Sequence, residues 1–120
     1  MKESIIQKRS FWVHLIHIFV FGTLFLYVGI QRTNIPTFLF PALMGLAVII
    51  LLYHGYKLWT SASPSWVYYI HILLVAPLLF YIGFTGKETS RKYFEFVLLL
   101  GFAAIGYHAY YLLHHFSFNI

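Results

Sequence analysis

Two pairs of histidines recur at a constant interval in this chain. His17 and His71 lie 54 positions apart, each between two isoleucines, and His54 and His108 lie 54 positions apart, each after a tyrosine. Imidazole is the commonest metal ligand in proteins and a frequent axial ligand of haem. The sequence contains no cysteine, so imidazole nitrogen is the strong ligand type that its apolar segments offer. These histidines are therefore the first candidates for chemistry.

The histidine pairs belong to a longer internal repeat. Residues 11–60 align without a gap on residues 65–114. The matched positions are Trp12-Val13 with Trp66-Val67, Ile16-His17-Ile18 with Ile70-His71-Ile72, Tyr27 and Gly29 with Tyr81 and Gly83, Phe40 with Phe94, Tyr53-His54 with Tyr107-His108, Tyr56 with Tyr110, and Leu58 with Leu112. The repeat predicts two copies of one structural element, each carrying two histidines.

The composition excludes a soluble globular domain. The 120 residues are 61% hydrophobic and 9% charged, with a mean hydropathy of +0.78. A soluble domain of this length has too little interior to hide so much apolar surface. Four apolar segments, at residues 11–30, 38–59, 66–84 and 93–115, are each close to the ~20 residues that cross a bilayer as a helix. Helices are expected because lipid offers the backbone no hydrogen-bond partners.

The predicted fold is all-α, a polytopic membrane four-helix bundle. Short polar connections make successive helices antiparallel, and a two-helix repeat returns the chain to its starting side. We therefore expect two tandem helical hairpins of the same orientation, related by a pseudo-twofold axis along the membrane normal. Residues 1–120 are expected to form a single membrane domain.

Several small or special residues are expected to shape these helices. Ser63 is the expected N-cap of the third segment. Pro77 lies in the middle of that segment and should kink it. Gly45, Gly101 and Gly106 should let the second and fourth segments approach their neighbours closely.

All four histidines are expected at one depth in the bilayer. His17 follows Trp12 by five residues, which is ~8 Å along a helix at 1.5 Å per residue. His54 precedes Trp59 by the same number, so it returns to the same depth from the same side. The repeat places the other two histidines likewise, and we predict a four-histidine layer near the face that carries the termini.

This layer predicts haem b or a copper, iron or zinc ion in a redox or electron-transfer role. The predicted ligands are His17, His54, His71 and His108. For haem, two facing histidines hold the iron, and Arg9 and Lys57 are expected to meet the propionates. Nearby tyrosines are expected to surround the ligands, namely Tyr53, Tyr56, Tyr107 and Tyr110. His14, His114 and His115 are expected to lie at the membrane interface.

Other interpretations stay open at this point. The histidines can be satisfied by water or backbone within the interfacial belt of aromatic residues, and the chain is then a cofactor-free structural or assembly protein. A small transporter or proton conductor gated by histidine is a third interpretation, since imidazole titrates between about pH 5 and 8. The chain lacks a Ser-His-Asp set, a phosphate loop and an H-E-x-x-H sequence, so a hydrolase or transferase is not expected.

The charge of the chain points to lipid. The net charge of +5 comes from few basic residues, at the ends and in the loops, which argues against a nucleic-acid partner. The bilayer is the expected partner, with a homo-oligomer or larger membrane assembly as a further prediction. Both termini are expected on one side of the membrane. Basic residues are equally numerous on the two sides, and the basic first flank slightly favours cytoplasmic termini.

Three hydrophobic motifs carry a family resemblance. They read W-V-x-x-I-H-I at residues 12–18 and 66–72, P-L-L-F-Y-I-G at residues 77–83, and G-F-A-A-I-G-Y-H-A-Y-Y-L at residues 101–112. With them the chain resembles small duplicated four-helix membrane proteins of large eukaryotic DNA viruses. The resemblance covers most of the chain and implies a viral membrane location, with no assigned activity.

Overall fold

The computed structural model describes the backbone of residues 5–119 and the side chains of residues 10–114, and all regular structure in that part is helical. In chain order the elements are α1 (Ile5–Ile16), the π-helical turn η1 (His17–Gly22), α2 (Thr23–Gln31), the 3-10 turn η2 (Arg32–Asn34), α3 (Leu39–Thr60), α4 (Trp66–Ile70), the π-helical turn η3 (His71–Val75), α5 (Ala76–Thr85), the 3-10 turn η4 (Gly86–Glu88) and α6 (Arg91–Asn119). The all-α prediction is confirmed for these residues.

Four helical runs are long and apolar enough to cross a membrane. They are Ser10–Asn34, Leu39–Thr60, Trp66–Glu88 and Arg91–His114. These runs match the four predicted segments to within a few residues at each end, but helix α1 already begins at Ile5, and α6 continues to Asn119. Large apolar side chains on their surfaces are widely exposed, with Trp59 at 90% and Phe84 at 74%, as suits side chains that face lipid.

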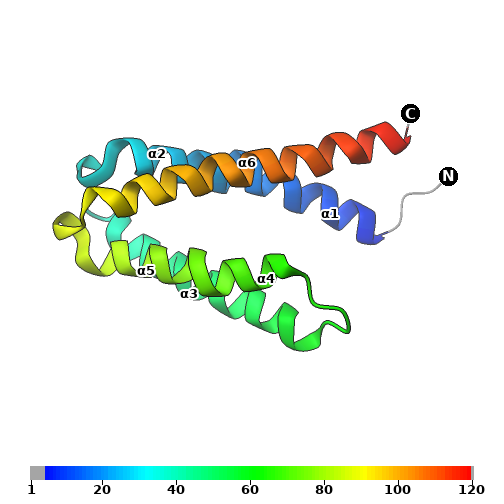
Figure 1. The fold of residues 1–120 in the computed structure, drawn as a ribbon, viewed down its shortest axis with the longest axis horizontal. Helices are drawn as coiled ribbons and strands as arrows, with labels where there is room; N and C mark the ends of the chain where they lie inside the picture. The colour runs from blue at the N-terminus through cyan, green and yellow to red at the C-terminus, as the bar shows by residue number, and fades with distance from the viewer. Residues whose placement is uncertain (1–4, 120) are drawn as a thin grey trace. The chain divides into compact units, whose positions relative to one another are not determined.

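The helices pack as two compact units. Unit 1 is Met1–Ile30 with Glu95–Ile120, and unit 2 is Gln31–Phe94. In unit 2, α3 packs against the run of α4, η3 and α5 (Figure 1). In unit 1, the run of α1, η1 and α2 packs against α6. Each unit thus takes one helix from each predicted repeat. The tandem-hairpin arrangement and the pseudo-twofold axis stay predictions.

In each unit, one glycine lies especially close to the backbone of the facing helix. In unit 1, a Cβ on Gly29 would lie 2.7 Å from the Leu98 Cβ and 2.9 Å from the Leu98 backbone nitrogen. In unit 2, a Cβ on Gly83 would lie 2.5 Å from the Phe40 carbonyl oxygen and 2.6 Å from the Met44 Cγ. Both contacts press a glycine against backbone, which is how small residues let helices approach closely. Gly29 and Gly83, like Met44 and Leu98, are 54 positions apart.

The prediction that three glycines allow close helix contacts holds at one of them and fails at two. A Cβ on Gly101 would meet Phe25 and Leu26 at 3.1 Å, so the prediction is confirmed there. A Cβ on Gly45 or Gly106 would meet nothing within 4 Å. The prediction is wrong for these two, because they lie on exposed helix faces.

Both π-helical turns begin at histidines, His17 and His71. In η3 the wide turn ends just before Pro77, and the N–H of Ala76 bonds to the carbonyl of His71. Proline has no N–H and clashes with the preceding turn, so a wide turn accommodates it at the predicted kink. The corresponding residue after η1 is Thr23, so proline alone does not cause these turns. Single π-helical turns occur frequently at functional sites.

The link between α3 and α4 corrects the predicted helix cap. Helix α4 begins at Trp66, and the Oγ of Ser65 accepts a hydrogen bond from the N–H of Val67 at 3.2 Å. Ser63 lies in the exposed link before this residue. The prediction of Ser63 as the cap is wrong because the helix starts two residues later than expected.

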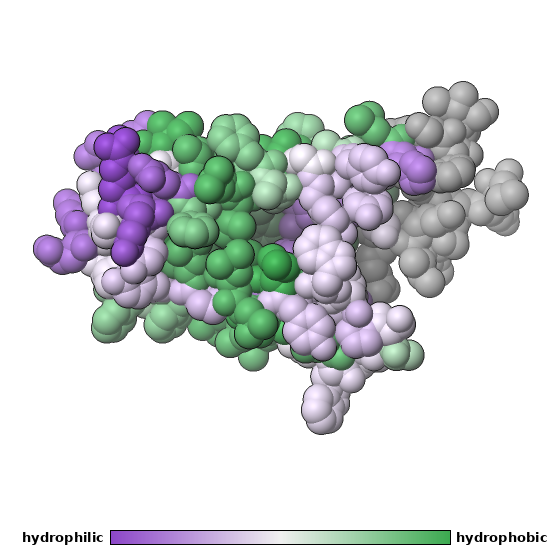
Figure 2. Space-filling view, in the orientation of Figure 1, coloured by the Kyte–Doolittle hydropathy of each residue, from purple (hydrophilic) through white to green (hydrophobic). Residues whose placement is uncertain are grey.

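The turns η2 and η4 hold a matched pair of left-handed residues. Strongly hydrophilic side chains gather where these turns lie, and hydrophobic ones cover the part of the helices next to them (Figure 2). Arg32 opens η2 with a φ of 56°, and Gly86 opens η4 with a φ of 57°. Glycine adopts this conformation without a Cβ clash, so Arg32 carries a strain that Gly86 avoids.

Candidate metal centre

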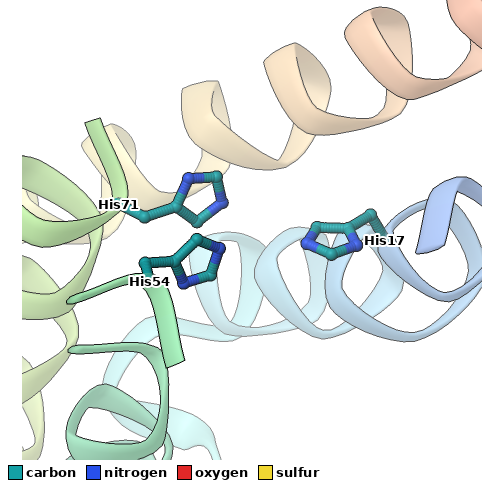
Figure 3. Close-up of side chains that lie close together, drawn as sticks. All are labelled: His17, His54 and His71. Carbon is teal, nitrogen blue, oxygen red and sulfur yellow. The ribbon is translucent and has the colours of Figure 1, made fainter. Parts of the chain in front are cut away.

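His54 and His71 face each other in unit 2 (Figure 3). His54 comes from α3 and His71 from the first position of η3, and their rings stack with centroids 4.0 Å apart and planes at 9°. His54 is 8% exposed. A ring nitrogen of one lies within 4.8 Å of a ring nitrogen of the other. An ion held at about 2.0–2.1 Å from two imidazoles needs nitrogens about 3–4 Å apart with their in-plane lone pairs turned toward it, so the two rings would have to rotate out of their parallel stack to share an ion.

Backbone hydrogen bonds fix the tautomer of three histidines, His17, His54 and His71. In each, Nδ1 lies 2.7–2.9 Å from the carbonyl oxygen four residues earlier. A carbonyl only accepts, so Nδ1 donates, and Nε2 of the neutral ring carries the lone pair. This bond is the one that commonly orients a metal-binding histidine. The three imidazoles labelled in Figure 3 are thus each able to serve as a metal ligand.

Unit 1 holds a histidine group of its own. The rings of His17 and His108 approach to 4.4 Å between centroids, with planes at 33°. His108 is 6% exposed, and its Nδ1 lies 2.8 Å from the Nδ1 of His14. Tyr111 stacks against His14 at 6.0 Å and 13°. Two of the four predicted ligands, His17 and His108, are therefore joined in this unit by a third histidine, His14.

His14 joins this group from α1, although only His17 and His108 were predicted as ligands. It is half-buried and hydrogen-bonded across to α6, and its expected place at the membrane interface stays a prediction. Its position three residues before His17 puts both on one helical face, which is the signal that could have found it. Of the other two interfacial candidates, His114 is exposed and stacks on Tyr110, and the side chain of His115 lies outside the described residues.

Haem does not fit between the rings of either pair. In a bis-histidine haem the imidazoles point end-on at the iron from opposite faces of the macrocycle. The rings of His54 and His71, at 4.0 Å, and of His17 and His108, at 4.4 Å, are instead in mutual contact. Within each unit, a haem between these rings would therefore require them to move apart. The single four-histidine layer involves both units and stays a prediction.

Of the four tyrosines predicted to surround the ligands, two contact a histidine ring and two are exposed on the helix surface. Tyr53 meets His54 edge-on, with centroids 5.1 Å apart, and Tyr107 meets His108 edge-on at 5.0 Å. These contacts hold each histidine ring in its orientation. Tyr56 and Tyr110 are 66% and 62% exposed, on the outer faces of their helices. Two of the predicted neighbours therefore contact the histidines through ring edges.

Lys57 and Arg9 are the two basic residues that were predicted to meet haem propionates. The Nζ of Lys57 lies 5.8 Å from the ring centroid of Tyr53, within the range of a cation–π contact. Arg9 belongs to α1, but its side chain lies outside those that the structure describes. The role of both residues toward a haem stays a prediction.

The ligands available near the histidines are nitrogen atoms. The chain has no cysteine, and its acids are Glu3, Glu88 and Glu95. Imidazole-only sites suit zinc, copper, iron and nickel. Comparison with protein-family models, characterised proteins and solved structures finds no match to the chain.

Proposed function

We propose that this chain is an integral membrane protein that binds a transition metal ion through His54 and His71. The ion is of the class that imidazole prefers, copper, iron or zinc. Copper or iron would give the site a redox or electron-transfer role, whereas zinc would stabilise the fold. Haem remains the less favoured cofactor, because the stacked rings leave no space for a macrocycle.

The observation that carries this proposal is the tautomer of two adjacent rings. Each donates its Nδ1 proton to the backbone, His54 to Ile50 at 2.9 Å and His71 to Val67 at 2.8 Å. Both Nε2 atoms are therefore electron-rich, and the rings lie face to face. A shared cation stabilises two such nitrogens in an apolar segment.

The position of the pair supports the same proposal. His54 and His71 lie inside two of the runs that are apolar enough to cross a membrane. Ionisable residues in such runs are costly and usually mark functional sites. We propose the bilayer as the protein's surroundings and, from the resemblance of its apolar stretches, a viral membrane as its location.

Metal titration of the full chain in lipid nanodiscs tests the proposal. After treatment with a chelator, the protein is titrated with Zn²⁺ and Cu²⁺, and bound metal is measured by elemental analysis. The double variant His54→Phe/His71→Phe should lower the affinity of this site at least tenfold, because both nitrogens are lost. His114→Phe removes an exposed histidine outside both groups and should leave the affinity unchanged.

Three results would contradict the proposal. Equal affinity in the wild type and in His54→Phe/His71→Phe would remove the pair as ligands. A Soret band in the purified protein would show that haem is the cofactor. A chain that binds neither would leave the cofactor-free assembly protein, in which the Nδ1 bonds of the histidines serve packing alone.

A further inference from the structure

Unit 1 presents its histidine nitrogens differently from unit 2. The Nδ1 atoms of His14 and His108 point at each other at 2.8 Å. In unit 2 both Nδ1 atoms are directed to backbone carbonyls. The close pair of nitrogens in unit 1 is thus made by Nδ1 atoms rather than by Nε2 atoms.

Two Nδ1 atoms only 2.8 Å apart need a proton or a metal ion between them, because two lone pairs at this distance would repel each other. When both rings are neutral, one proton is shared, because the second nitrogen must supply a lone pair. A tetrahedral ion with metal–nitrogen bonds of about 2.0–2.1 Å requires the nitrogens to be about 3.3 Å apart. Replacing the proton by an ion therefore needs the pair to open by about half an ångström.

The surroundings of the pair suit an ion. Tyr111 stacks on His14, and Tyr107 meets His108 edge-on. These aromatic contacts restrict the orientation of both imidazole rings. His14 is half-buried and lies near the start of the run Ser10–Asn34, about 6 Å along the helix. This close to the end of the run, water is expected to complete the coordination of an ion. The ring of His17, 4.4 Å from that of His108, adds a further imidazole beside the pair.

We propose that His14 and His108 form a second metal site, which binds zinc or copper through their Nδ1 atoms. The site lies wholly within unit 1 and does not depend on the proposed site of His54 and His71. Its new ligand is His14. The protein then carries a site in each unit, with the ion held by opposite nitrogens of the imidazole ring.

The experiment counts zinc ions in the full chain in nanodiscs after equilibration with Zn²⁺. The wild type should bind about two ions, and His54→Phe/His71→Phe should still bind about one. His14→Tyr, which installs the residue found at the matching position of unit 2, should lose one ion. His114→Phe is the control and should keep both. Circular dichroism of each variant checks that the helices remain.

Imidazole ¹⁵N NMR of the zinc-loaded wild type gives a readout that does not depend on any variant folding. Zinc should shift the Nδ1 resonances of His14 and His108. Nδ1 resonances that zinc leaves unmoved would overturn the second site, and so would a zinc content unaffected by His14→Tyr. Loss of all zinc in His54→Phe/His71→Phe would overturn it while leaving the proposed function intact. A chain with one ion on His14 and His108 alone would support the second site and contradict the proposed function.

Discussion

The two units hold their histidines on similar scaffolds but surround them with different neighbours. In unit 1 the facing helix brings His14 to His108, whereas the residue 54 positions after His14 is Tyr68. The ring of Tyr68 lies 6.4 Å from that of His54. The Nδ1 of His54 turns to its own backbone, and the Nδ1 of His108 turns to His14. The two matched histidines, His54 and His108, therefore differ in the partner of their Nδ1 atoms, and the residue at position 14 or 68 is the neighbour that differs with them.

Because the two units share a scaffold, we predict that replacing Gly29 or Gly83 by a larger residue destabilises the protein to the same extent. Gly29→Ala and Gly83→Ala should each lower the free energy of unfolding by about 1–3 kcal/mol, because a methyl group would push against backbone. Chemical denaturation of the full chain in detergent, followed by circular dichroism, measures this loss.

Gly106→Ala is the matched control, since nothing lies within 4 Å of its added Cβ. It should change stability by no more than about 0.5 kcal/mol. A Gly29→Ala variant as stable as Gly106→Ala would contradict the packing of α2 on α6. Unequal losses at Gly29 and Gly83 would show that the two scaffolds differ.

The differing neighbours predict that unit 2 can be given a third ligand. Tyr68→His copies the arrangement of unit 1 and should raise the zinc affinity of unit 2 about tenfold, or ~1.4 kcal/mol. Isothermal titration in a His14→Tyr background restricts the measurement to unit 2. Tyr69→His is the control, because Tyr69 is 47% exposed on another face of the helix. Equal gains from the two substitutions would contradict a role for position 68.

The turns η2 and η4 should respond with opposite signs. Arg32→Gly should stabilise the chain by about 1 kcal/mol, because it relieves a left-handed conformation on a non-glycine residue. Gly86→Ala should destabilise it by a similar amount, because its φ is also positive. Thermal unfolding of both variants measures the effect, and a shift of the same sign in both would contradict the assignment.

The smallest expected effect concerns the start of α4. Ser65→Ala removes the side chain that accepts the Val67 N–H and should cost about 0.5–1 kcal/mol. Ser63→Ala, two residues earlier, should leave the unfolding temperature unchanged. If Ser63→Ala proved the more damaging of the two, the helix would begin at the originally predicted cap.

Hydropathy was enough to predict the four apolar helices, because lipid leaves a chain of this composition few other conformations. The candidate histidines in unit 2 were also predictable, since His54 and His71 stand out as polar residues in apolar runs. The spacing of Gly45, Gly101 and Gly106 did not identify which glycine faces a neighbour. That choice depends on the helix packed opposite, and a sequence of spans does not specify helix partners.

The orientation of the imidazole rings was beyond prediction for a related reason. His14 is on the same helical face as His17, but its partner His108 lies 94 positions away. The nitrogen that each ring presents depends on a rotamer and on a backbone carbonyl, which no residue pattern encodes. The composition of the site was therefore accessible from sequence, and its geometry was not.

X-ray absorption at the metal edge tests the central claim most directly. The copper- or zinc-loaded His14→Tyr protein isolates the site of His54 and His71. The account predicts at least two imidazole nitrogens at about 2.0–2.1 Å from the ion, with the imidazole scattering lost in His54→Phe/His71→Phe. A shell of oxygen atoms without imidazole scattering, or a spectrum unchanged by the double substitution, would contradict the claim that these histidines bind the metal.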